Sequence, residues 1–121
     1  MTIKIYEYRG CSTCRKALKY LDANNKKYEK AGIVEQPPTV RELETMLGYL
    51  KASGKTLKNL FNTSGEQYRA LRIGERIKAG MTEQEAIALL SKNGKLIKRP
   101  FLLTSKGGTT GFHVETWDEL V

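Results

Sequence analysis

The first thirty residues carry two successive hydrophobic patterns. In TIKIYEY, residues 2–8, apolar and polar side chains alternate and β-forming residues dominate, which predicts a strand. Over about residues 12–24 the apolar side chains, including Ala17 and Leu21, recur at helical spacing. The segment NNKKYEKAGI then predicts a turn and a short second strand around residues 27–30. A strand, a helix and a strand within about thirty residues are typical of a βαβ unit with two parallel strands.

The pattern from residue 39 to residue 93 is helical. Three of its segments start with a hydroxyl residue followed three positions later by Glu or Gln, which predicts a capping box at each helix start. These pairs are Thr39 with Glu42, Ser64 with Gln67, and Thr82 with Glu85. Short loops are expected at Gly54, Gly65 and Gly80, and Gly94 is placed to end the last helix. We therefore expect three or four helices in this part of the chain.

The pattern returns to strands after the helical segment. One strand is expected at residues 101–104, followed by a Gly107-Gly108 turn and a second strand near residues 109–112, so that the two form a hairpin. The last residues, ETWDELV, predict a short helix. This order of elements is the outline of a thioredoxin-like α/β fold with helices inserted between its halves.

Length and composition are those of one globular domain. The chain has 121 residues, of which 40% are hydrophobic and 28% charged, so we expect a single domain over residues 1–121 with one substantial core. No apolar run reaches the roughly 18–20 residues that a membrane helix needs. The first ten residues also lack the apolar stretch of a signal peptide. We therefore expect a cytoplasmic protein without membrane contact.

The chain is basic, with 21 Lys and Arg against 13 Asp and Glu and a formal net charge of +8. This charge favours anionic partners such as oxyanions, acidic protein surfaces or nucleic acid. The basic residues are scattered and are not interleaved with aromatic residues, and no nucleic-acid-binding motif is present. We interpret the charge as a basic solvated surface, and we expect no direct nucleic-acid binding. Without an evident interface motif, the expected state is a monomer.

Both cysteines of the chain, Cys11 and Cys14, stand at the expected start of the first helix. At positions i and i+3 they share a helix face and are close enough for a disulfide. The field of a helix N-terminus stabilises a thiolate by roughly 0.3–2 kcal/mol, which brings an ordinary thiol pKa of about 8.5 down to about 7–8. Stronger activation requires a nearby cation. Arg9 and Arg15 are local candidates, and folding could supply a more distant arginine.

Three interpretations of the cysteine pair remain open: a redox pair, half of a metal site, or two inert thiols. A redox pair is favoured because the spacing, the helix start and the expected compartment agree. A zinc site would need two further donors, and His113 is the only histidine, so no metal is expected. A second notable feature is Arg99-Pro100 at the start of a predicted strand, where proline marks a strand start, a sheet edge or a cis peptide.

Together, these motifs give the chain a resemblance to the thioredoxin-fold arsenate reductase-like family (ArsC/Spx/YffB-like). The matching stretches are CSTCRKAL, LFNTSGEQYR, LLSKNGKLIKRP and the GF pair near the end, in the order of the family. The resemblance implies a four-stranded mixed sheet of thioredoxin type, with a helical insertion, about residues 39–93, between the second and third strands. It also implies that Cys11 is the nucleophile, that Arg99 precedes the cis-proline of the family at Pro100, and that this arginine is the distant cation.

The chain departs from the arsenate reductases of this family at the oxyanion site and at the second cysteine. Those enzymes use further arginines and one cysteine, with glutathione as the resolving thiol. One arginine position corresponds to Asn62, and the segment LLTSKGGTTGF has Lys106 as its only cation. Lysine does not reproduce the bidentate fork of arginine. Cys14 stands where a resolving cysteine would, as in the Spx branch. The resemblance thus favours thiol-disulfide exchange over efficient arsenate reduction.

The first functional hypothesis is a thiol-disulfide oxidoreductase without a bound cofactor. Cys11 attacks an oxidised thiol or anionic small molecule, Cys14 resolves the adduct, and thioredoxin, or glutathione with glutaredoxin, acts as the reductant. Ser12 and Thr13 offer N–H groups and hydroxyls to an anion at the helix start, although such residues are also common at any helix start. Arg99, Arg15 and Pro100 complete the expected site.

The alternative hypothesis is a redox-sensing regulator. The resemblance to the Spx branch implies that the CxxC pair acts as a switch and that the protein binds the C-terminal domain of the RNA polymerase α subunit. The basic surface would then favour the encounter with an acidic partner.

Overall fold

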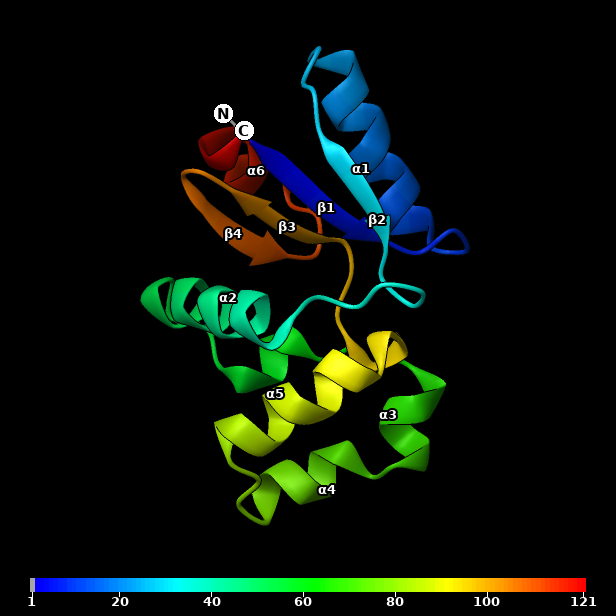
Figure 1. The fold of residues 1–121 in the computed structure, drawn as a ribbon, viewed down its shortest axis with the longest axis vertical. Coiled ribbons are helices and arrows are strands. Elements are labelled where there is room, and N and C mark those ends of the chain that lie inside the picture. Colours follow the sequence, from blue (N-terminus) through cyan, green and yellow to red (C-terminus); the bar gives the residue numbers. More distant parts are fainter. Residues whose placement is uncertain (1) are drawn as a thin grey trace.

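The computed structural model describes residues 2–121 and contains one mixed four-stranded sheet in the order β2-β1-β3-β4 (Figure 1). Strands β1 (Ile3–Glu7) and β2 (Glu29–Gly32) are parallel and are joined by helix α1 (Ser12–Ala23). Strand β3 (Phe101–Thr104) pairs antiparallel with β1 and with β4 (Gly107–Thr110). This sheet confirms the predicted thioredoxin-like α/β fold.

The helical insertion lies between β2 and β3. It comprises α2 (Val40–Ala52), the 3₁₀ turn η1 (Leu57–Leu60), α3 (Glu66–Ala70), α4 (Ile73–Lys78) and α5 (Glu83–Lys92). A second 3₁₀ turn, η2 (Gly94–Leu96), leads into β3, and α6 (Val114–Leu120) follows β4. In Figure 1 the helices α3 to α5 lie at the end of the molecule opposite α1. None of the helices in the described part of the chain is long and apolar enough to cross a membrane.

Two hydrophobic cores cover the two faces of the sheet. Ile3 and Ile5 of β1 pack with the buried face of α1 and with Trp117 of α6. Tyr6 points to the other face and joins the larger core, which is built mainly from α2, α5 and the 3₁₀ turns. The alternating pattern of the first strand therefore separates the α1–α6 layer from the helical insertion.

A polar cluster links β1 to the start of α2. The Tyr6 hydroxyl donates to Glu42 Oε1 at 2.6 Å, and Lys4 Nζ lies 3.3 Å from Glu42 Oε2. Burial acts to raise the pKa of Glu42, but hydrogen bonds with Tyr6 and the Thr39 backbone, together with the charge of Lys4, outweigh it and lower that pKa. Glu42 also completes the predicted capping box, because its backbone N–H donates to Thr39 Oγ1 at 3.1 Å.

One of the three predicted capping boxes is wrong. The Thr39 and Thr82 boxes form, but α3 begins at Glu66 with Gly65 as its N-cap, and Ser64 does not cap it. Ser64 donates instead to Asn62 Oδ1 at 3.4 Å. The reason is a tight turn: the Gly65 N–H donates to the Asn62 carbonyl at 3.1 Å, which moves the helix start one residue later.

Two predicted strand positions are also corrected. The second strand occupies residues 29–32 and not 27–30, because α1 ends in a turn at Asn25, with φ of 54°, before the chain can pair with β1. The hairpin turn is Ser105-Lys106, and both Gly107 and Gly108 belong to β4. Gly108 lies against α2: a Cβ there would come within 3.1 Å of Tyr49 Cδ2 of that helix. These glycines therefore allow neighbouring elements to pack closely against β4, and they do not form the hairpin turn.

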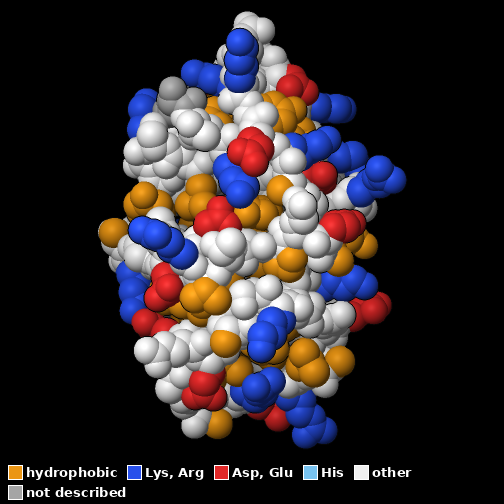
Figure 2. All heavy atoms as spheres, viewed as in Figure 1, with side chains coloured by type: hydrophobic (Ala, Val, Ile, Leu, Met, Phe, Trp, Pro, Cys, Tyr) orange, Lys and Arg blue, Asp and Glu red, His pale blue; other side chains and the backbone are white. Residues whose placement is uncertain are grey.

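The surface is basic without one dominant patch on the viewed face. Figure 2 shows Lys and Arg side chains spread over this face, with Asp and Glu side chains between them. Such mixing agrees with the interpretation of the net charge of +8 as a solvated surface.

Candidate active site

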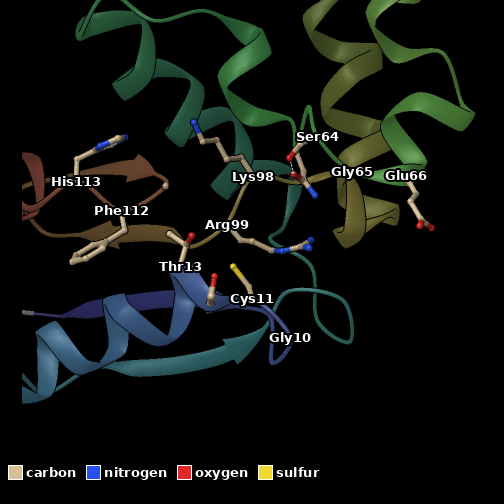
Figure 3. A pocket seen from close by; sticks show the side chains of 13 residues that line it. Gly10, Cys11, Thr13, Ser64, Gly65, Glu66, Lys98, Arg99, Phe112 and His113 are labelled. Carbon is tan, nitrogen blue, oxygen red and sulfur yellow. Dashed lines mark hydrogen bonds between the residues drawn. The ribbon is translucent and has the colours of Figure 1, made fainter.

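An open cleft of about 760 Å³ lies where the start of α1 meets the helical insertion and the start of β3. Its walls come from four segments that are distant in the sequence (Figure 3). They are Gly10 to Thr13, Asn62 with Ser64 to Glu66, Lys98 with Arg99, and Gly111 to His113. The cleft therefore brings the cysteine motif together with the arginine that precedes β3.

Cys11 is the N-cap of α1, and its backbone is extended there (φ −94°, ψ 114°). The backbone N–H of Cys14 donates to Cys11 Sγ at 3.3 Å, so the sulfur occupies the position of a capping oxygen. The N–H of Cys11 donates to the Tyr8 carbonyl at 3.0 Å and closes the turn before the helix. Cys11 is half-buried and Cys14 is buried, and both thiols are free.

Arg99 reaches over Cys11 from the other side of the cleft (Figure 3). Its Cζ lies 4.4 Å from the centroid of the Tyr8 ring, in a cation–π contact that holds the guanidinium beside the turn. The Arg99-Pro100 peptide bond is cis. The sequence had left a strand start, a sheet edge and a cis peptide open as the role of this proline. Pro100 is buried and does not line the cleft.

The two thiols differ strongly in acidity. Burial acts to raise the pKa of Cys11, but hydrogen bonds with the Cys14 thiol and backbone and the positive charge of Arg99 outweigh it, so this pKa lies below its ordinary value. Burial raises the pKa of Cys14 to about 12, helped by its hydrogen bond with Cys11 and by the negative charges of Cys11 and Glu7. Cys11 is therefore the thiol that ionises first.

The other predicted residues are divided between the cleft and the surface. Ser12 and Thr13 line the cleft beside Cys11. Arg15 does not: it is exposed, and its Nη1 donates to the Arg9 carbonyl at 3.1 Å. Its guanidinium is therefore bound to the loop before α1 and does not line the cleft.

Lys98, Glu66 and His113 line the cleft although the sequence alone did not single them out for it. Lys98 runs beside the end of β4, since a Cβ at Gly111 would lie 3.2 Å from Lys98 Cε. Its position next to Arg99 in KRP is the only signal that could have indicated it. Lys106 lies in the hairpin turn and lines a different cavity, so Lys98 and not Lys106 is the lysine that accompanies Arg99 in the cleft.

Within residues 2–121 no three or more His, Cys, Asp or Glu side chains gather closely enough to hold a metal ion. The chemistry that the described cleft can support is that of a thiolate and of anion-binding side chains. A CxxC pair at a helix start, with an arginine and a cis-proline beside it in a thioredoxin-like sheet, defines a class of thiol-containing α/β proteins.

Within this class, the chain belongs to the ArsC family, whose family model matches residues 6–120. It is 40% identical over 119 residues to protein YusI of Bacillus subtilis, covering 98% of each chain. It is 27% identical to global transcriptional regulator Spx 2 of Bacillus anthracis, over 93% of this chain and 82% of that protein. The structure of an ArsC family related protein from Bacteroides fragilis superposes with a TM-score of 0.88 at 42% identity, covering 100% of this chain and 98% of that one.

Proposed function

We propose that this protein is a thiol-disulfide oxidoreductase of the ArsC family that uses Cys11 and Cys14. The Cys11 thiolate attacks a disulfide, forms a mixed disulfide and releases one substrate thiolate. Cys14 then attacks Cys11 Sγ, which gives the Cys11–Cys14 disulfide and releases the second thiolate. A cytoplasmic thiol reductant, thioredoxin or glutathione with glutaredoxin, returns the pair to the dithiol and supplies the two electrons.

The observation that carries this proposal is the asymmetry of the pair. Cys11 is accessible from the cleft and its pKa is lowered, whereas Cys14 is buried and its pKa is about 12. An attacking thiol must be ionised and accessible, and a resolving thiol must be close but protected from outside reagents. Cys11 meets the first requirement and Cys14 meets the second. Two inert thiols would not require this difference in acidity and exposure.

The cleft favours an anionic substrate. Arg99 and Lys98 place two cations on one wall, and the start of α1 adds the N–H groups near Ser12 and Thr13. Neutral Asn62 lines the cleft beside the segment of Lys98 and Arg99, because Phe61 and Ile97 form a β-bridge, and the resemblance leads one to expect an arginine at this position. A tetrahedral oxyanion such as arsenate would therefore have only one bidentate arginine partner in the cleft, so we expect disulfides to be better substrates than arsenate.

The midpoint potential of the Cys11–Cys14 couple tests the proposal. Alkylation followed by mass measurement across a graded thiol buffer should give a value between roughly −180 and −280 mV, the span of glutaredoxins and thioredoxins. Disulfide reduction should disappear in Cys11→Ser. Turnover that survives this substitution, or a pair that never forms a disulfide, would contradict the proposal.

A redox-sensing regulator is the second candidate, and the 27% identity to a transcriptional regulator named Spx 2 is the observation that favours it. In that case the disulfide would change the affinity for a protein partner, and RNA polymerase, through its α subunit, is the partner to test first. Binding to the purified C-terminal domain of the RNA polymerase α subunit should then differ between oxidised and reduced protein. Equal affinity in both states, or none, would count against the switch.

A further inference from the structure

Lys98 and His113 direct two nitrogen atoms toward the same point of the cleft wall. Both residues line the cleft, and both approach Gly111. A Cβ at Gly111 would lie 3.7 Å from Lys98 Nζ and 3.9 Å from His113 Nε2. Because glycine has no Cβ, the two nitrogens face one small space above its backbone. A ligand group with two acceptor oxygens can contact both of them there.

The backbone under this space is held from two sides. Gly111 has a φ of 80°, in the left-handed region that favours glycine. Its N–H donates to the Pro100 carbonyl at 2.8 Å, and its carbonyl accepts from Trp117 Nε1 at 3.0 Å. Phe112 packs edge-on against Trp117, with ring centroids 4.9 Å apart. The segment that carries His113 is therefore fixed relative to the start of β3, and the two nitrogens are positioned before a substrate binds.

Arg99, the cation next to Lys98 in the sequence, has other partners. Its charge and a hydrogen bond act on the Cys11 thiol, and its guanidinium lies over the Tyr8 ring. The ion pairs between residues 2–121, in contrast, include neither Lys98 nor His113. A cation without a partner in a concave site attracts anions. Lys98 and His113 are therefore free to bind a part of the substrate other than its reacting sulfur.

Charge is distributed unevenly along the cleft. In Figure 3 Lys98 and His113 lie on one side of Cys11, and Glu66, an acidic residue of the lining, lies on the other. The side with Lys98 therefore favours a negative group. Among the anionic groups of small thiols, the carboxylate offers two oxygens that can accept from two separate donors. The arrangement of the two nitrogens over Gly111 matches this group.

We infer that Lys98 and His113 form a carboxylate-binding subsite and that the protein selects small disulfides carrying a carboxylate, an assignment that rests on the proposed thiol-disulfide function. The subsite holds the carboxylate while the Cys11 thiolate attacks one sulfur of the disulfide. A bond forms between Cys11 and that sulfur, and the substrate S–S bond breaks. Its electron pair leaves with the second half of the substrate as a thiolate. The open cleft of about 760 Å³ provides the room for such a molecule.

The test compares three small disulfides that differ in charge: dithiodipropionate with two carboxylates, neutral hydroxyethyl disulfide, and cystamine with two ammonium groups. Acid quenching and mass-shift alkylation give the rate constant of Cys11 with each disulfide. The ratio of dithiodipropionate to hydroxyethyl disulfide should fall about fivefold in Lys98→Met and in His113→Phe, the effect of a partly exposed charge contact. A change in the reactivity of Cys11 itself acts on every disulfide and cancels in this ratio.

Two further variants separate a subsite from the general positive field of the protein. Lys106→Met removes the same charge from the hairpin turn, outside the cleft, and should leave the ratio unchanged. Lys98→Arg keeps the charge and should keep most of the preference. Cystamine, which Lys98 repels, should react faster relative to hydroxyethyl disulfide in Lys98→Met. Lys98 is half-buried and His113 is exposed, so these substitutions should not prevent folding.

The results that overturn the inference are distinct from those that overturn the proposed function. A ratio that stays constant in Lys98→Met, or that falls equally in Lys106→Met, would exclude the subsite. A fall in Lys98→Met with no change in His113→Phe would exclude a subsite shared by the two residues. If Cys11 of the unmodified protein reacts with none of the three disulfides, the proposed function itself fails, and the subsite fails with it.

Discussion

Replacing Gly94 by alanine should destabilise the chain and disturb the cleft at the same time. Gly94 begins η2, just before the segment that carries Lys98 and Arg99, and it touches the backbone that follows β2. A Cβ at Gly94 would lie 1.8 Å from the Ile33 carbonyl oxygen and 3.0 Å from Val34 Cα. Both contacts are with backbone atoms, which cannot rotate away as a flexible side chain can. One of the two segments must therefore move by at least about 1 Å.

The expected cost follows from the effect of overpacking a core. Added methyl groups in well-packed sites cost about 1–3 kcal/mol, and a backbone contact places Gly94→Ala at or above the upper end of that range. For a domain of this size, about 3 kcal/mol corresponds to a fall in melting temperature of roughly 10–15 °C. Because the shift is transmitted to Arg99, the pKa of Cys11 should also rise toward its ordinary value.

Thermal unfolding followed by circular dichroism measures the loss of stability in Gly94→Ala, and Gly48→Ala is the control. Gly48 is exposed within α2, and a Cβ there would meet nothing within 4 Å, so alanine should stabilise the helix by about 0.5–1 kcal/mol. The two glycine substitutions should therefore move the melting temperature in opposite directions. A melting temperature of Gly94→Ala within about 2 °C of the unmodified protein would refute the reasoning.

Three further predictions concern the site and the acid stability. Arg99→Met should raise the pKa of Cys11, measured by the pH dependence of its alkylation rate, while Arg15→Met should leave that pKa unchanged; equal effects would contradict the geometry of the cleft. Cys14→Ser should trap a mixed disulfide on Cys11 that mass spectrometry detects, and rapid turnover by this variant would exclude Cys14 as the resolving thiol. The pKa of Glu42 is lowered from 4.5 in the folded protein, so the ionised carboxylate stabilises the fold. The unmodified protein should therefore be more stable than Glu42→Gln by about 1 kcal/mol or less at this partly exposed site, fully so above pH 4.5 and progressively less as the pH falls below it. A difference in unfolding free energy that persists at pH 2 would contradict this prediction.

Local signals predicted the elements that local interactions form. The alternating pattern of residues 2–8 contains β1, and the Thr39 and Thr82 boxes mark two helix starts correctly. The predictions failed where a distant part of the chain decides the conformation. Two adjacent glycines are a common turn signal, but Gly107-Gly108 lies in a strand because α2 packs on it. Packing between segments that are distant in the sequence produces no pattern among neighbouring residues, so the sequence pattern alone does not reveal it.

The same distinction holds for the candidate site. Cys11, Ser12 and Thr13 are adjacent in the sequence, so the helix start alone places them together. Arg99 entered through the family resemblance, because nothing local connects it with a cysteine 88 positions earlier. Glu66 could not be predicted, since it reaches the cleft only when the helical insertion docks against the sheet.

The walls of the cleft are carried by elements that pack in different hydrophobic cores, and we expect this division to couple chemistry at Cys11 to motion of the helical insertion. Cys11 is attached to the α1–α6 layer, whereas Glu66 starts the five-residue helix α3 on the insertion side. Short helices of this kind open at a lower free-energy cost than the rest of a domain. A covalent adduct that fills the cleft and contacts both walls would restrain such opening. Amide hydrogen exchange in α3, more than 50 residues away from the reacting sulfur along the chain, would then report formation of the adduct on Cys11.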